Sequence, residues 1–119
     1  MQGIISSVGQ QIPYRDFDIV LTAETSGTSN WVADASIGGD AYTQTKLTAD
    51  ISPSVWIDAN THFDVLPCKR SGQQVLTESD LDIFASISYA ESTATGIKFV
   101  SVTGQPTADI PLTLRIYKQ

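Results

Sequence analysis

The clearest pattern in the chain is the strict alternation of apolar and polar side chains over residues 109–118. Alternation of this length is typical of a half-buried β-strand. We expect this strand to close a sheet begun by residues 18–23, with Pro111, which lacks a backbone donor, near its start or on an exposed edge. The apolar positions on its inward face are Ile110, Leu112, Leu114 and Ile116.

Shorter patterns of the same kind occupy most of the remaining chain. Alternation from Phe17 to Ala23 predicts a first strand, and the Thr-rich residues 42–49 predict another. In the latter, the buried face is ambiguous because Tyr42 and Leu47 have opposite parity, and a bulge would bring both onto one face. Short apolar runs predict further strands at 31–33, 55–57, 63–66, 83–89 and 97–102.

One short helix is expected among the strands. Thr77 precedes the acidic segment 78–82 in the arrangement of an N-cap followed by carboxylates at the amino end of a helix. At most two helical turns should follow, and then a meander of the last three strands, 83–89, 97–102 and 109–118. With no β-α-β alternation, these elements predict an all-β fold, an antiparallel β-sandwich of about seven strands with one short helix.

The chain divides into an N-terminal extended arm, residues 1–15, and a β-sandwich domain, residues 16–119. The arm has no sustained period, yet it carries several apolar side chains that would gain stability by burial. Two readings stay open: an arm that docks on a neighbouring subunit or larger assembly, and an ordinary first strand. The candidate docking residues are Ile4, Ile5, Val8, Ile12 and Tyr14.

Length, net charge and the distribution of apolar residues limit the classes of partner that the sequence predicts. The 119 residues suit one domain, and the net charge of -6, with no basic cluster larger than Lys69-Arg70, predicts no nucleic-acid binding. No stretch reaches the ~18 apolar residues of a membrane span, so no membrane insertion is expected. Residues 1–7 have neither a basic nor an apolar region of the kind found in signal peptides, so none is expected.

Few residues offer catalytic or metal-binding chemistry. His62 lies between Asp58 and Asp64, but the spacing matches no metal motif, and a structural role for the carboxylates is the simpler reading. Cys68, the single cysteine, has two basic neighbours that could lower a thiol pKa, yet it lacks an adjacent base. We therefore expect no enzyme, no cofactor and no metal site.

Acidic and aromatic side chains were the remaining candidates for ligand binding. Five aspartates offer oxygen ligands of the kind that calcium prefers, but no calcium-loop motif contains them. A saccharide could stack on a platform of exposed aromatic rings, although large aromatics more often lie in a core or an interface. The candidates are Trp31, Trp56, Tyr42 and Tyr89, with the two tryptophans foremost. The five aspartates are Asp16, Asp18, Asp34, Asp40 and Asp50.

Four segments together resemble a β-rich module of tailed bacteriophages and prophages. They are Y-T-Q-T at 42–45, Ile57-Asp58, the acidic helix at 77–82, and P-T-A-D-I-P-L-T-L at 106–114. The resemblance spans about residues 18 to 118, and the last segment is the most specific. Lys46 and Thr48 depart from the small apolar residues usual after Y-T-Q-T. Proteins with this module form parts of tail fibres, baseplates or head fibres and are commonly trimeric.

The resemblance implies a non-enzymatic structural protein of the virion, an accessory head, neck or tail-fibre subunit. The expected partners are further copies of itself, with a trimer as the first expectation, and other virion proteins. The length suits a self-standing subunit better than the tip of a fibre shaft. The alternative is a host-surface adhesin module that binds a cell-surface glycan through Trp31 or Trp56.

Overall fold

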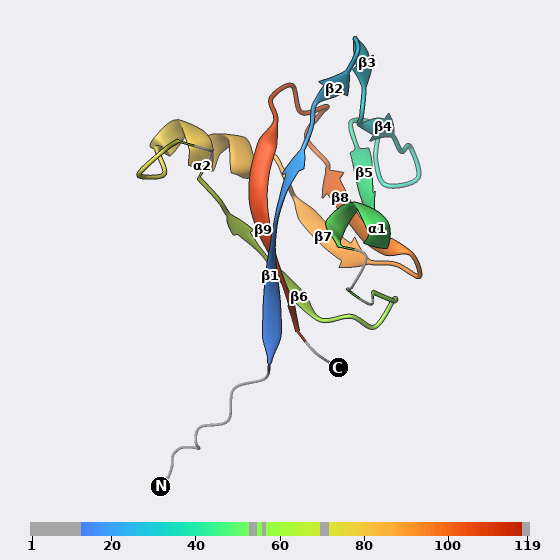
Figure 1. The fold of residues 1–119 in the computed structure, drawn as a ribbon. Helices are drawn as coiled ribbons and strands as arrows, with labels where there is room; N and C mark the ends of the chain where they lie inside the picture. Colours follow the sequence, from blue (N-terminus) through green and yellow to red (C-terminus); the bar gives the residue numbers. More distant parts are fainter. Residues whose placement is uncertain (1–12, 53–54, 56, 70–71, 118–119) are drawn as a thin grey trace, which may run out of the picture.

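The chain folds into two antiparallel sheets and a small separate ribbon (Figure 1). The computed structural model describes residues 13–52, 55, 57–69 and 72–117. The three-stranded sheet and the four-stranded sheet together hold seven strands, as predicted. In chain order the elements are β1 (Tyr14–Leu21), β2 (Glu24–Thr25), β3 (Thr28–Ser29), β4 (Val32–Ala33), β5 (Tyr42–Leu47), α1 (Thr48–Ile51), β6 (Phe63–Pro67), α2 (Glu78–Phe84), β7 (Tyr89–Ser92), β8 (Gly96–Ser101) and β9 (Ile110–Tyr117).

The three-stranded sheet has the order β1-β9-β6. β9 pairs along its whole length with β1, from Leu21 opposite Ile110 to Tyr14 opposite Tyr117. This confirms that the last strand closes a sheet begun by the first one. The alternation of β9 is also confirmed, because its four predicted inward side chains are buried. Pro111 is the second residue of the strand, where its missing donor costs little.

The four-stranded sheet has the order β4-β5-β8-β7. β5 pairs with β8 in one unbroken register from Tyr42 to Leu47, so no bulge resolves the ambiguity in its buried face. Tyr42 and Gln44 face inward, whereas Leu47 points outward and is 49% exposed. Gln44 tolerates burial because its side-chain amide donates to the carbonyl of Thr22 at 3.0 Å.

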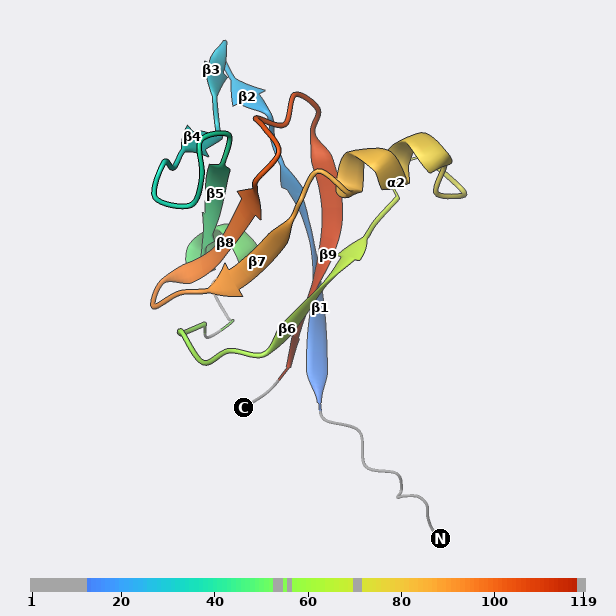
Figure 2. The same cartoon turned by 180° about the vertical axis from the view of Figure 1, so that it is seen from behind.

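The hydrophobic core lies between the two sheets. β9 supplies its four buried aliphatic side chains, and Ile97 and Phe99 of β8 face them from the other sheet. Ile83 and Phe84 of α2 pack against the same cluster. Figures 1 and 2 show α2 beside the upper part of β9, so this helix covers one end of the core.

The region between α2 and the last strand departs from the prediction. Residues 83–84 complete α2, and β7 begins only at Tyr89, so the alternation at 83–89 does not mark one strand. β8 pairs with β5 and β7, whereas β9 lies in the other sheet. The expected meander is therefore wrong: the chain crosses between sheets after β8.

The two helices begin in different ways. Thr77 is the predicted N-cap of α2, since its hydroxyl accepts from the Asp80 amide at 3.2 Å and its own amide donates to the Asp80 carboxylate at 3.0 Å. The single turn α1 follows β5 directly and was not predicted. Neither helix in the described part of the chain is long and apolar enough to cross a membrane.

Candidate binding surface

The three-stranded sheet has an outer face, on the side away from the core, that is rich in charged and aromatic groups. Its residues alternate with the core residues of β1, β9 and β6. The pairing places Arg115 between Asp16 and Asp64, and Thr113 between Asp18 and Leu66. The outer face comprises Tyr14, Asp16, Asp18, Val20, Asp64, Leu66, Pro111, Thr113, Arg115 and Tyr117.

Arg115 is the centre of the outer face. Its Nε donates to Oδ1 of Asp16 at 2.9 Å and its Nη2 donates to Oδ2 at 3.2 Å. Its guanidinium carbon also lies 4.2 Å from the ring centroid of Tyr14. The hydrogen bond from Arg115 lowers the pKa of Asp16, while the same bond raises the pKa of Arg115. The pair is thus fixed in its charged form.

Two further cross-strand bonds order this face. The Tyr117 hydroxyl donates to Oδ2 of Asp64 at 2.6 Å, and this bond raises the pKa of the phenol. The Thr113 hydroxyl donates to Oδ1 of Asp18 at 2.7 Å. The rings of Tyr14 and Tyr117 meet edge to face, with centroids 5.9 Å apart. Side chains from all three strands are therefore held in defined positions on one exposed surface.

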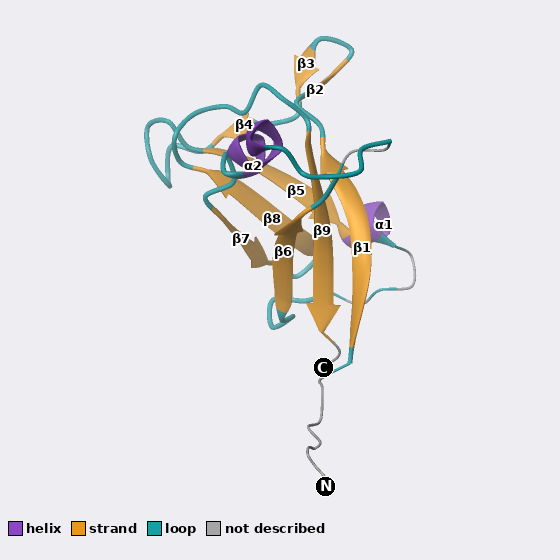
Figure 3. Cartoon of the chain, turned by 90° about the vertical axis from the view of Figure 1, so that its left-hand side faces the viewer, coloured by secondary structure: helices purple, strands orange, loops and turns teal. Residues whose placement is uncertain are grey.

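A groove of about 450 Å³ lies at the upper end of the outer face. Its β1 wall is formed by Asp18, Ile19 and Val20, and β9 and the residue before it contribute Pro111 and Asp109. Cys68 and Lys69, which follow β6, complete the lining. In Figure 3 the segment after β6 passes across the upper part of this sheet.

The acid-histidine-acid cluster considered around His62 does not assemble. The His62 side chain is exposed, and its backbone carbonyl accepts from the Tyr117 amide at 3.0 Å. Asp58 accepts from the Asn60 amide at 2.8 Å within its own turn, while Asp64 binds Tyr117. Within the residues the structure describes, no three His, Cys, Asp or Glu side chains form a group that could hold a metal ion.

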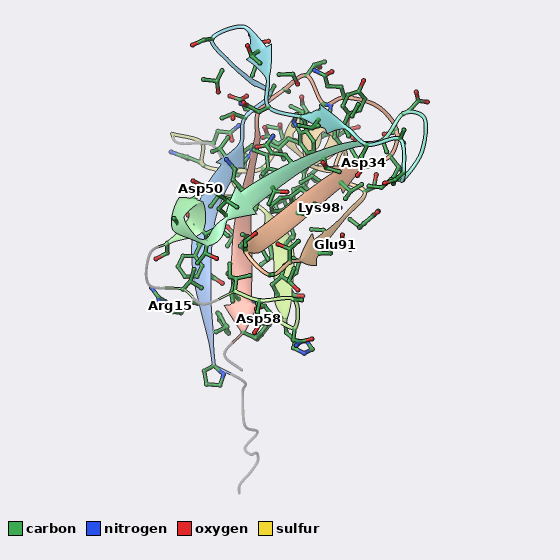
Figure 4. All side chains as sticks on the ribbon, turned by 90° about the vertical axis from the view of Figure 1, so that its right-hand side faces the viewer. Arg15, Asp34, Asp50, Asp58, Glu91 and Lys98 are labelled. Carbon is green, nitrogen blue, oxygen red and sulfur yellow. The ribbon has the colours of Figure 1, made fainter. Side chains whose placement is uncertain are left out.

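The five aspartates considered as calcium ligands do not form a metal-binding group within the residues that the structure describes. Asp16 and Asp18 lie on β1, and Asp50 accepts from the Leu47 amide at 3.1 Å at the start of α1. Asp34 binds Ser36 in a turn, which lowers its pKa. Figure 4 shows Asp34 with Lys98 and Glu91, and Lys98 lies 3.5 Å from the Glu91 carboxylate. Lys98 is thus engaged by a carboxylate of the four-stranded sheet.

Trp31, a candidate for saccharide stacking, is not on the outer face. Trp31 is only 3% exposed and belongs to the core cluster, so a sugar ring cannot stack on it in this conformation. This corrects the prediction for Trp31, whose size and apolarity draw it into the core. Trp56 lies outside the described residues. The aromatic pair on the outer face is Tyr14, which is 46% exposed, with the half-buried Tyr117.

The predicted docking arm is described only at its carboxyl end. Ile4, Ile5, Val8 and Ile12 lie outside the described residues. Tyr14 is the first residue of β1, and Arg15 pairs with Ile116, so both belong to the sheet rather than to an arm ending at residue 15. They join the sheet because the ladder with β9 continues as far as Tyr117.

Sequence reasoning missed the outer face because its charged groups come from opposite ends of the domain. Asp16 and Arg115 are 99 positions apart, and only the register of β1 against β9 brings them together. The available signal was the alternation itself, which placed Arg115 and Tyr117 on the outward side of β9.

No family model, curated protein or solved structure matches the chain.

Proposed function

We propose that this chain is a non-enzymatic structural subunit of a tailed-bacteriophage particle, an accessory head, neck or tail-fibre protein. In this proposal it attaches through its N-terminal segment and associates with further copies of itself. The phage origin rests on the resemblance of the segments at 42–45 and 106–114 to phage β-rich modules. The docking role rests on how β1 is anchored.

The observation that carries the docking role is the attachment of Tyr14 to the far end of β9. Its ring packs edge to face with Tyr117 and lies under the Arg115 guanidinium, so the root of the N-terminal segment is tied to two side chains of the closing strand. Because β9 is the central strand of its sheet, a force that pulls on residues 1–12 would be transmitted through β1 to β9 and the core. A docking segment needs such a fixed point of attachment to the folded domain.

The burial of Trp31 supports docking over the saccharide-binding alternative. An adhesin that stacks sugars needs an exposed ring face, and the Trp31 ring is enclosed by the core. Of the aromatic pair on the outer face, Tyr14 already has the guanidinium of Arg115 on its ring and Tyr117 donates its hydroxyl to Asp64. Both are engaged with groups of this same chain.

The test removes or neutralises the N-terminal segment while keeping Tyr14. Deletion of residues 1–12 should leave the thermal transition little changed but abolish incorporation into phage particles that lack the subunit. A full-length variant with Ile4, Ile5, Val8 and Ile12 all changed to Ser provides a control of equal length. It should fold, keep its oligomeric state and also fail to incorporate.

Each outcome of this test bears on the proposal. If both variants incorporate normally, attachment lies elsewhere and the docking role is wrong. If the deletion unfolds the domain, the segment is an intrinsic part of the sheet. Native mass measurement of the intact protein checks self-association, and a monomer at particle-assembly concentrations would contradict that part of the proposal.

A further inference from the structure

The groove combines an apolar wall with an available negative charge. Val20 is 44% exposed although it is an aliphatic side chain, and Pro111, opposite it on β9, extends the apolar surface. A volume of about 450 Å³ lies within the range of sites that bind small ligands or single large side chains. The groove therefore suits an apolar group.

The charges around the groove favour a cation beside that apolar group. Oδ1 of Asp18 accepts from Thr113, whereas its other oxygen has no hydrogen-bond partner among the described residues. Within the part of the chain that the structure describes, the basic residue of the lining is Lys69, which directs its ammonium to the Gln74 carbonyl at 3.1 Å. Asp16, the next carboxylate along β1, is already neutralised by Arg115. Asp109, the other carboxylate of the lining, accepts from the Ala23 amide at 2.8 Å. Asp18 is thus the carboxylate placed to receive an external cation.

The spacing of the two features matches an extended peptide. Asp18 and Val20 lie two residues apart on the same face of β1. A strand-like segment repeats its side chains on one face with the same period, so a Lys or Arg two positions from a Leu would reach both at once. A second copy of this chain is a poor occupant, since its net charge of -6 would oppose docking at an acidic site.

We propose that this groove binds an extended segment of a partner protein in which a basic side chain stands two residues from a large apolar one. The basic side chain pairs with Asp18 and the apolar one enters between Val20 and Pro111. This surface is separate from residues 1–12 and does not depend on their docking role.

Cys68 provides a direct reporter, because it lines the groove and is the only cysteine in the chain. The probe is the peptide acetyl-Arg-Thr-Leu-Thr-Arg-amide, and the readouts are the rate of Cys68 reaction with a disulfide reagent and amide shifts in NMR spectra of the intact protein. The peptide should slow the labelling and shift residues of the groove. Matched peptides in which Glu replaces Arg, or Gly replaces Leu, should neither slow the labelling of Cys68 nor shift the groove residues.

Variants of the protein complete the test. Asp18→Asn should weaken peptide binding about fivefold and reduce its salt dependence, and Val20→Lys should abolish it. Val32→Lys is the control, because Val32 is 65% exposed on the other sheet and should leave binding unchanged. Equal effects of the acidic and basic peptides, no protection at millimolar peptide, or equal loss in Val32→Lys would overturn the proposal. Conversion of a native oligomer to monomer by Val20→Lys would assign the groove to self-association instead.

Discussion

Arg115 and Asp16 form a two-point ion pair across β9 and β1, with Nε 2.9 Å from Oδ1 and Nη2 3.2 Å from Oδ2. The pair joins the first and last strands of the domain, whose backbones are already paired from Tyr14 to Leu21. Both side chains are partly exposed, so the pair contributes more to fixing the geometry of the outer face than to overall stability.

The first prediction concerns acid pH. Because the hydrogen bond from Arg115 lowers the pKa of Asp16, the folded state binds this proton less tightly than the unfolded state. The stabilisation is therefore present above the ordinary aspartate value of about 3.9 and is lost as pH falls through the lowered pKa. Urea unfolding between pH 2 and 6 should show a smaller loss of stability in Asp16→Asn than in the parent. An unchanged slope would contradict this.

The second prediction concerns alkaline pH. Since the bond to Asp64 raises the pKa of Tyr117, this residue should ionise above the usual tyrosine value of about 10. The hydrogen bond from Tyr117 to Asp64 therefore stabilises the folded state below pH 10, and this stabilisation is lost as pH rises through the raised pKa. Ultraviolet titration should show a late phenolate step that disappears in Tyr117→Phe. Asp64→Asn should move that step to lower pH, and an unmoved step would exclude the assigned bond.

Several parts of the fold were predictable because they depend on local pattern. The buried face of β9 follows from alternation alone, and the cap at Thr77 follows from a hydroxyl preceding carboxylates. The sheet that each strand joins does not follow from pattern, because alternation only requires one buried face and either sheet provides it. That is why the crossing from β8 to β9 was mistaken for a meander.

The candidate site was less predictable than the fold. Once β1 is paired with β9, opposite charges at Asp16 and Arg115 support the observed register, but neither residue alone identifies it. The groove is harder to predict than the pairing of Asp16 with Arg115, since Cys68 and Lys69 reach it from the segment after β6 and carry no periodic signal. Long-range register and loop placement are tertiary properties, which a local pattern does not encode.

The third prediction tests the two faces of β9. Leu114→Ala should lower the free energy of unfolding by about 2–5 kcal/mol, because Leu114 is fully buried and the change leaves a cavity. Thr113→Val, its neighbour on the outer face, should cost less than about 1.5 kcal/mol, since it loses only the bond to Asp18. Thr113→Asp is not a suitable control, because it would place a carboxylate against Asp18. Equal denaturation midpoints for the two variants would refute the assignment of faces.

The fourth prediction concerns the indole of Trp31. Its Nε1 is buried and has no hydrogen-bond partner within the described residues, so the N–H is desolvated without compensation. Trp31→Phe removes this donor while keeping an aromatic ring, and should change stability by less than about 1.5 kcal/mol. Trp31→Ala should cost about 3–5 kcal/mol through the cavity. Chemical denaturation of both variants measures the difference, and a Phe variant as unstable as the Ala variant would show that the N–H is satisfied.

The last prediction concerns the contact between Gly96 and the paired strand β5. A Cβ at Gly96 would lie 2.9 Å from the Cα of Leu47 and still closer to the carbonyl oxygen of Lys46, and both are backbone atoms that cannot rotate away. Gly96→Ala must therefore push β8 from β5, and we expect a loss of about 1–3 kcal/mol from overpacking. Gly38→Ala is the matched control, because a Cβ there meets no atom within 4 Å. Thermal unfolding and amide exchange should show the Gly96 variant destabilised and the β5–β8 amides exchanging faster, with the Gly38 variant unchanged. If Gly96→Ala melts with the parent protein, the close approach of these two strands is not a constraint on the fold.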